Sequence, residues 1–211
     1  MTEARERTLP LLGALTGLVP GAALQRGTTV ACSGSAAMSL AMTVIAGPVR
    51  GGSWAAIAGV PTFGLRAAGE LGVTASRLVR VAPPAGGLDA NRWADAVGAM
   101  IDGFDLVVLG PELRVRPQVA RRLQSRAQSR GAVLLTVGAP DGFGADVQLV
   151  GLRQWWDGLG DGHGVATARR VEVEVRGRRV PRAQRAMLWL PDADGELRVE
   201  AAPVLTLART G

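Results

Sequence analysis

Short apolar runs alternate along the chain with segments of helical spacing. The runs have the length of strands, and the most apolar, FDLVVLG, is typical of a parallel sheet. They cover residues 28–32, 54–58, 78–82, 104–110 and 132–137, of which 54–58 is expected to be fully buried. The segments with helical periodicity cover residues 36–50, 64–71, 88–101 and 117–130. This alternation predicts an α/β domain with a mostly parallel sheet.

The pattern changes after Asp146, where short strands and turns are expected. Val171, Val173 and Val175 alternate with charged residues, as in a strand with one buried face. Residues 186–200 predict a hairpin that turns at Asp192–Gly195. The C-terminal part is therefore expected to extend the sheet with antiparallel strands.

A chain of 211 residues fits one domain with a full core. Residues 1–27 form a lead-in, in which Leu9, Leu11, Leu12 and Leu15 predict a short apolar helix. Residues 28–150 form the predicted α/β core, and residues 151–211 form the antiparallel extension and tail of the same domain.

The net charge is +6, and all 24 basic residues are arginine. Arginine binds phosphate through a bidentate fork, but a bias toward GC-rich codons also replaces lysine with arginine throughout a chain. One cysteine and one histidine exclude the usual structural zinc clusters and an internal disulfide. No apolar run reaches the roughly 18–20 residues of a membrane span, and the start lacks a signal-peptide core, so we expect a cytoplasmic protein.

Residues 28–47 have the frame of a phosphate-binding P-loop: a strand, a turn of small residues and a buried helix. A working P-loop needs Gly-Lys-Ser/Thr at its end. If Gly34 is the first motif glycine, Ser39, Leu40 and Ala41 occupy those positions, and a count back from the helix gives Ala37 and Met38 instead. Because the chain has no lysine, no register restores the motif. Gly34, Ser35, Ala36, Ala37, Met38, Ser39, Leu40 and Ala41 therefore form a degenerate P-loop, and no nucleotide cofactor is expected.

The order of these segments resembles the RecA-type core over most of the chain. TTVACSGSAAMSLAMTVIAG resembles its first strand and P-loop, GFDLVVLGP its Walker B strand, and RRLQSRAQSRGAVLLTVG the following helix and strand. The Walker B strand ends in Leu109–Gly110 without an acid, Asp105 lies at its start, and Val60–Pro61 occupies the place of the family's catalytic glutamate. The two DNA-binding loops are reduced to GPELRVRP and GAPDGFGA. These departures favour a protein that is not an enzyme.

Within degenerate RecA folds, this arginine-rich chain resembles the ImuA family, and more narrowly the actinobacterial ImuA-prime group, some of whose members are labelled SulA-like. The resemblance implies an accessory protein of an SOS-induced mutasome in translesion synthesis. Its implied partners are ImuB, a catalytically dead Y-family-like polymerase, and indirectly an error-prone C-family polymerase, with RecA and DNA as further candidates. Alternatives are a direct DNA- or RecA-binding regulator and a SulA-like inhibitor of cell division.

Two arginine groups are candidate partner or DNA surfaces, although solvated, solubilising faces are the alternative for both. One is Arg121, Arg122, Arg126 and Arg130, on the helix at 117–130. The other is Arg169, Arg170, Arg176, Arg178, Arg179, Arg182 and Arg185, in a C-terminal region where a strand edge or hairpin tip is expected to meet ImuB.

Trp155 and Trp156 are expected to pack in the core with one ring partly exposed, and an exposed docking patch is the alternative. His163 lies among turn residues with no catalytic partner spaced near it, so an ordinary loop residue is expected. Asp157 and Asp161 are assigned to turns rather than to catalysis.

Overall fold

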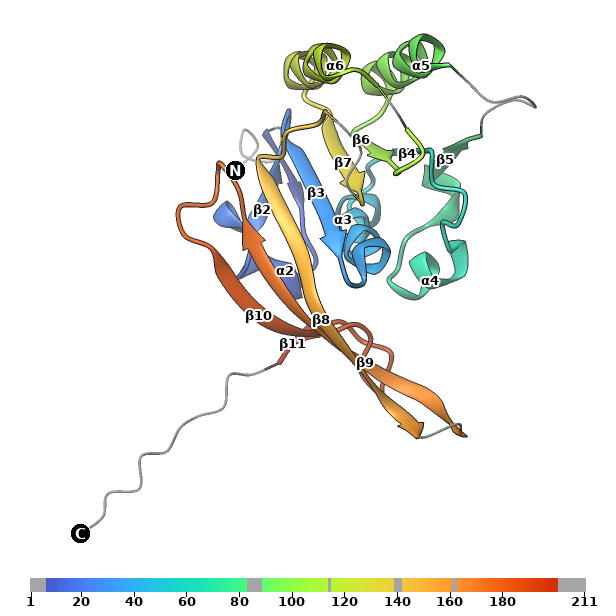
Figure 1. Cartoon of the computed structure of the whole chain (residues 1–211), viewed down its shortest axis with the longest axis vertical. Coiled ribbons are helices and arrows are strands. Elements are labelled where there is room, and N and C mark those ends of the chain that lie inside the picture. Colours follow the sequence, from blue (N-terminus) through green and yellow to red (C-terminus); the bar gives the residue numbers. More distant parts are fainter. Residues whose placement is uncertain (1–6, 83–88, 114, 139–141, 161–162, 201–211) are drawn as a thin grey trace.

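The computed structural model describes residues 7–82, 89–113, 115–138, 142–160 and 163–200 (Figure 1). Within these ranges, one sheet of nine strands organises the molecule. Six of its strands are parallel to one another: β3 (Thr29–Gly34), β4 (Ala55–Ala58), β5 (Leu78–Val81), β6 (Leu106–Leu109), β7 (Val133–Val137) and β8 (Val147–Gly160). Their order across the sheet is β8-β3-β7-β6-β4-β5, which confirms the predicted α/β class and mostly parallel sheet.

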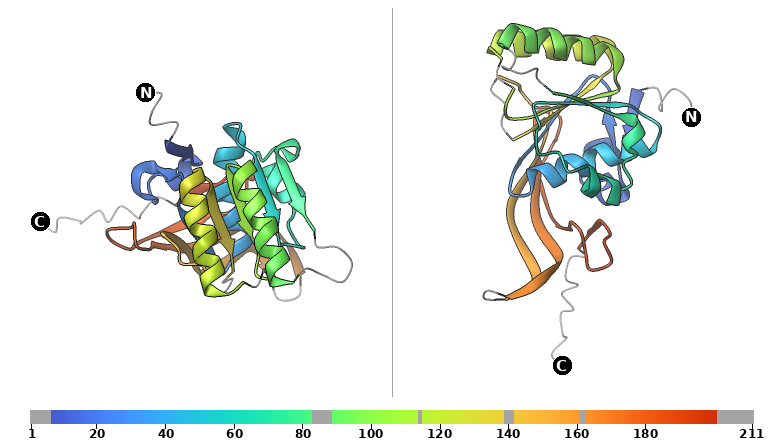
Figure 2. Two further views of the ribbon diagram at one scale, coloured as in Figure 1. Left: turned by 90° about the horizontal axis from the view of Figure 1, so that it is seen from above. Right: turned by 90° about the vertical axis from the view of Figure 1, so that its right-hand side faces the viewer.

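Helices cover both faces of the parallel part, as the two views of Figure 2 show. Two of them, α3 (Ala37–Arg50) and α4 (Leu65–Glu70), pack on one face, and α5 (Ala90–Gly103) and α6 (Pro117–Arg130) pack on the other. Strand β6 shows why its sequence is a continuous apolar run: Leu106 and Val108 lie in the α3-side cluster, and Val107 and Leu109 lie under α5 and α6.

Three antiparallel strands continue the sheet beyond β8: β9 (His163–Arg176), β10 (Gln184–Trp189) and β11 (Arg198–Val199). Val171, Val173 and Val175 point into the α3-side core, as their alternation predicted. The cluster beneath α5 and α6 contains no described residue of β8 to β11. The sheet is therefore covered by helices on two faces in one half and on one face in the other.

The hairpin of β8 and β9 projects beyond the remainder of the sheet (Figures 1 and 2). The pairing of β3 with β8 ends at Gly34 and Gly151, and the pairing of β10 with β9 ends at Trp189 and Arg170. Residues 155–160 and 163–168 therefore form a two-stranded arm with solvent on most sides. We call these residues the β-arm.

Several helix boundaries follow from sequence signals. Helix α6 spans the predicted residues because Pro117 starts it with a fixed φ and Gly131, at a φ of 71°, ends it. Asp89 caps α5 by accepting the N–H groups of Asn91 and Arg92. Single-turn 3₁₀ helices at Pro20–Ala22 and Ala75–Arg77 lead into strands. No helix in the described ranges is long and apolar enough to cross a membrane.

Three expectations were wrong in detail. The lead-in is not one apolar helix: Leu9 lies in β1 (Thr8–Pro10), which pairs with β2 (Ala23–Gln25), and only α2 (Gly13–Thr16) is helical between them. Trp54 precedes β4 and is 44% exposed, and its backbone N–H donates to Asp105 Oδ2 at 3.1 Å. The strands after Asp146 are not short, since β8 and β9 have 14 residues each. Strand β8 also runs across the expected boundary at residue 150, so the core and its extension share one strand.

Candidate functional site

The turn between β3 and α3 occupies the place of the degenerate P-loop. Only Ser35 and Ala36 connect the strand to the helix, so Ser39, Leu40 and Ala41 already lie inside α3. Leu40, where the P-loop lysine would stand, is buried in the α3-side core. A P-loop wraps phosphate with several backbone N–H groups of an extended loop, and a two-residue connection does not supply that wrap.

Strand β8 packs directly against the turn between β3 and α3. The Ser35 N–H donates to the Gly151 carbonyl at 2.8 Å, and a Cβ on Gly151 would lie 1.7 Å from the Ser35 carbonyl oxygen. Gly34 has a φ of 73°, and Ala36 has a φ of 60°, which a residue with a Cβ adopts only at a cost of about 1–2 kcal/mol. The backbone of this turn is thus held by the neighbouring strand.

Arg169 contacts two other residues that the sequence singled out, Ser39 at the start of α3 and Trp156. Its Nη2 donates to Ser39 Oγ at 2.6 Å, its Nε donates to the Leu190 carbonyl at 2.8 Å, and its guanidinium lies 4.9 Å from the centre of the Trp156 ring. Burial lowers the pKa of the Arg169 guanidinium from its ordinary value. A cation therefore fills the position beside the α3 N-terminus and fixes the base of the β-arm to the core.

The β-arm carries the exposed apolar surface of the C-terminal region. Trp155 and Trp156 are 38% and 44% exposed, which corrects the expectation that they pack in the core with one ring partly exposed. Leu159 and Val165 near the end of the arm are 53% and 77% exposed. The alternative of an exposed patch therefore describes the geometry, because the strands extend past the helices that would have covered these side chains.

His163 and Asp157 take different places from those expected. His163 is the first residue of β9, opposite Gly160, rather than a loop residue. Asp157 lies in β8 rather than in a turn and pairs with Arg170 at 3.4 Å. Asp161 lies outside the described residues.

On the sheet face without a helix, arginines are paired with carboxylates, both between neighbouring strands and, for Arg176, within β9. Arg153 contacts Glu172 at 2.9 Å, and Arg176 and Arg185 contact Glu174 at 3.2 and 2.9 Å. Arg170 stacks on Trp189 with its guanidinium 5.3 Å from the ring centre. Cross-strand ion pairs and stacking thus stabilise a face that no apolar layer covers. Arg170, Arg176 and Arg185 of the C-terminal arginine group therefore contact side chains of the protein itself.

The arginines of α6 divide into two pairs. Arg126 and Arg130 bind Asp102 of α5, whose pKa is lowered mainly by its hydrogen bond from Arg126, with charge attraction from both arginines adding to it. Arg121 and Arg122 are exposed, and no contact within the described ranges pairs them with a carboxylate.

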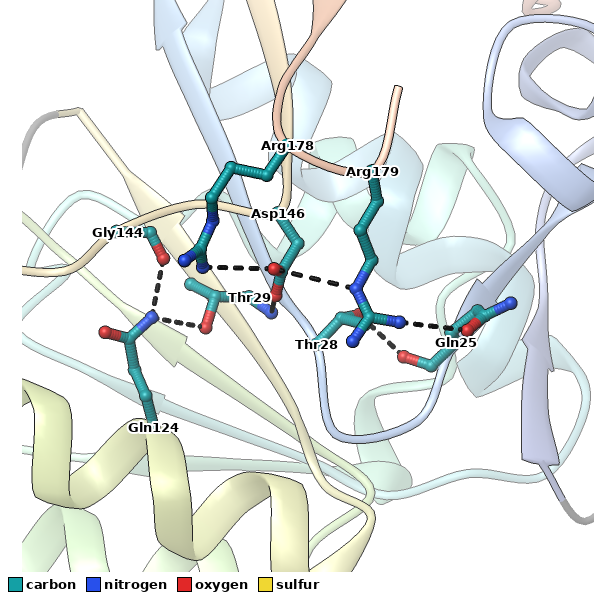
Figure 3. A network of polar contacts seen from close by, with 8 residues as sticks. All are labelled: Gln25, Thr28, Thr29, Gln124, Gly144, Asp146, Arg178 and Arg179. Atoms are coloured by element: carbon teal, nitrogen blue, oxygen red, sulfur yellow. Dashed lines mark hydrogen bonds and ion pairs between the residues drawn. The ribbon is translucent and has the colours of Figure 1, made fainter. Parts of the chain in front are cut away.

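A polar network at the opposite, amino-terminal edge of β3 and β8 was not predicted (Figure 3). Asp146 accepts the Thr29 N–H at 2.9 Å and contacts Arg178 and Arg179 at 3.1 and 3.6 Å. Gln124 of α6 donates to Thr29 Oγ1 at 2.9 Å and to the Gly144 carbonyl at 2.5 Å. Arg182 is exposed on the same connection between β9 and β10. The sequence signal for this network is Asp146, an acid directly before strand β8. Its partners Thr29, Arg178 and Arg179 come from distant segments, so the sequence did not reveal them.

Comparison with known proteins identifies the family from the parallel half. The family model described as the MT3502 N-terminal domain matches residues 17–142. The chain belongs to this family. It is also 40% identical to uncharacterized protein Rv3395c of Mycobacterium tuberculosis over 121 residues, which is 56% of this chain and 56% of the relative. The chain thus matches just over half the length of that curated relative.

The match to the MT3502 N-terminal domain divides the candidate residues. It includes the β3–α3 turn and all four arginines of α6. It ends before Asp146, so the β-arm, Arg169 and the connection from β9 to β10 lie beyond it. The family match thus includes the arginine group of α6 but not the C-terminal arginine group.

Proposed function

We propose that this member of the MT3502 N-terminal domain family is a non-catalytic, RecA-like scaffold of an SOS-induced mutasome in the cytoplasm. In this role it binds an ImuB-like Y-family pseudo-polymerase and helps to recruit an error-prone C-family polymerase during translesion synthesis. Recruitment works by raising the local concentration of the polymerase at a lesion, without chemistry in the scaffold itself.

The observation that carries the proposal is the β-arm. Trp155, Trp156, Leu159 and Val165 present apolar surface on a ribbon that is held at its base by Arg169. Tryptophan is enriched in interface hot spots, and a rigid ribbon loses little conformational entropy when it binds. The two-residue β3–α3 turn supports a non-catalytic role, because Leu40 lies in the core where a P-loop lysine would reach phosphate.

Co-purification with the ImuB-like partner tests the proposal. Truncation of the C-terminal strands is unsuitable because it would remove Val171, Val173 and Val175 from the core. The double substitution Leu159→Asp and Val165→Asp changes only exposed side chains of the β-arm. We expect the wild-type pair to co-elute and the double variant to lose at least about tenfold in affinity, since charged groups would enter an apolar contact.

Leu65→Asp is the matched control, because Leu65 on α4 is 54% exposed, close to Leu159 at 53%. It should bind the partner as wild type does. A wild-type protein that is folded by circular dichroism but does not co-elute would refute the scaffold role. Equal binding by the β-arm variant would refute the β-arm as its interface.

A further inference from the structure

A basic pocket lies between α6 and the connection from β9 to β10. It has a volume of about 430 Å³, and its charged lining consists of Arg121, Arg178, Arg179 and Asp146. Arg121 comes from one of the two arginine groups expected from the sequence, and Arg178 and Arg179 come from the other. Folding therefore brings Arg121 together with Arg178 and Arg179, which lie more than 50 positions away in the chain.

The pocket carries an excess of positive charge. Asp146 is its one carboxylate among the described residues, and it is shared by Arg178, Arg179 and the Thr29 N–H. The side chain of Asp146 is only 15% exposed, while that of Arg178 is 70% exposed. Each guanidinium has five N–H donors, so most donors of Arg178 remain available to a ligand. Among the described residues no carboxylate pairs with Arg121, so three arginines face one acid in this lining, and that acid is already engaged.

The positive surface continues along α6. A second hollow, of about 830 Å³ between α5 and α6, shares Arg121 and Ser125 with the first and also contains Arg122. Arg126 in this hollow binds Asp102, and the lining also contains Asp95, so three arginines face two acids there. Among the described residues, no ion pair joins Arg122 to either acid. Arg122, Arg121, Arg179 and Arg178 thus line two adjoining hollows at the α6 end of the molecule, away from the end of the β-arm (Figure 1).

The chemistry of the lining fits a phosphate backbone. Besides arginine it contains Gln124, Ser125 and Gln128, residue types that contact DNA phosphates, and its lining includes no aromatic residue on which a base could stack. The hydrogen-bond donors are spread over two adjoining hollows, so they suit the successive phosphates of a nucleic-acid strand better than a single enclosed anion. On the open sheet face the charges are closer to balance, because Arg153, Arg176 and Arg185 share two carboxylates, Glu172 and Glu174.

We propose that Arg121, Arg122, Arg178 and Arg179 form a sequence-independent binding surface for the phosphate backbone of DNA. This inference is independent of the proposed partner, because helix α6 and the end of the β8–β9 hairpin lie at opposite ends of the molecule in Figure 1. A scaffold with both surfaces holds its partner and the DNA at the same time.

Fluorescence anisotropy with a labelled single strand and with the corresponding duplex tests the surface. Both carry the same phosphate chemistry, and the comparison shows which form is preferred. We expect the affinity of the wild type to fall linearly on a log–log plot between about 50 and 200 mM salt, with a slope of about −0.7 per neutralised phosphate for the single strand and about −0.9 for the duplex.

The informative variant is Arg121→Glu with Arg122→Glu, since neither residue has an internal carboxylate partner to leave behind. It should lose at least about tenfold in affinity, and its salt slope should fall by about the equivalent of two phosphate contacts. Arg178→Gln with Arg179→Gln should produce a smaller loss in the same direction, because it removes two positive charges, whereas the glutamate variant also adds two negative ones.

The matched control is Arg66→Glu with Arg80→Glu, two exposed arginines outside both hollows that change the net charge equally. Thermal unfolding verifies that all variants fold. Unchanged affinity in the control and a large loss in the Arg121/Arg122 variant would support the surface. Equal losses in both, a flat salt dependence, or no binding by wild type would overturn it, whatever the outcome with the ImuB-like partner.

Discussion

The two halves of the sheet differ in how their faces are covered. The central strands β7, β6 and β4 are covered by helices on both faces and are buried along their whole length, as in Leu106 to Leu109 of β6. Strands β8 to β10 are covered only on the α3 side, where Val171, Val173 and Val175 pack. Their other face is held by arginine, glutamate and tryptophan contacts. The first half is thus specified by packing, and the second supplies accessible surface.

The largest expected contrast comes from equivalent truncations in the two halves. Leu109→Ala in β6 removes a fully buried side chain and should lower the free energy of unfolding by about 2–5 kcal/mol. Met187→Ala on the helix-free face of β10 should cost less, about 0.5–1.5 kcal/mol, because Met187 is only partly buried. Denaturant unfolding measures both values. Equal costs would show that an unrecognised layer covers the second face.

Arg169→Ala tests the contact between the base of the β-arm and helix α3. The substitution removes two hydrogen bonds from a guanidinium and its stacking on Trp156, so we expect a loss of about 1–3 kcal/mol in the free energy of unfolding. Arg169→Lys should restore only part of it, since an ammonium cannot reproduce both directional bonds and planar stacking. Full restoration by lysine would mean that charge alone holds the base of the β-arm.

The smallest effect is expected at the ion pairs between α5 and α6. The pKa of Asp102 lies below its ordinary value of 3.8 because Arg126 donates a hydrogen bond to it. A lowered pKa in the folded state stabilises the protein above the unfolded value, and this contribution is lost as the pH falls from about 4 through the lowered folded value. Wild type should therefore exceed Asp102→Asn in thermal stability near neutral pH, and the difference should shrink in acid. A difference that grows in acid would contradict this assignment.

Local signals accounted for much of the parallel half. Pro117 and Gly131 delimit α6 in the sequence itself, and the apolar runs of β4, β6 and β7 match their burial on two faces. The lead-in was misjudged because Leu9, Leu11, Leu12 and Leu15 satisfy a helical spacing, although Leu9 pairs with Leu24 of β2. A distant strand overrode a weak local pattern, as non-local pairing often does.

The candidate sites depended more strongly on tertiary structure. The absence of lysine was enough to exclude a working P-loop, but the closure of the turn on Gly151 and the placement of Arg169 at Ser39 involve residues over 100 positions apart. Trp155 and Trp156 are equally apolar in the sequence whether they are buried or exposed, and only the reach of β8 past its neighbours exposes them.

The sequence by itself determined the class of fold and the buried strands, because periodicity and residue type are local properties. Which arginines are free for a partner was decided only in three dimensions. Arg126 binds Asp102 on another helix, Arg185 binds Glu174 on a neighbouring strand, and Arg121 and Arg122 contact no acid among the described residues. Charge acts through space at distances of a few ångströms, so its partners are fixed by packing and not by position along the chain.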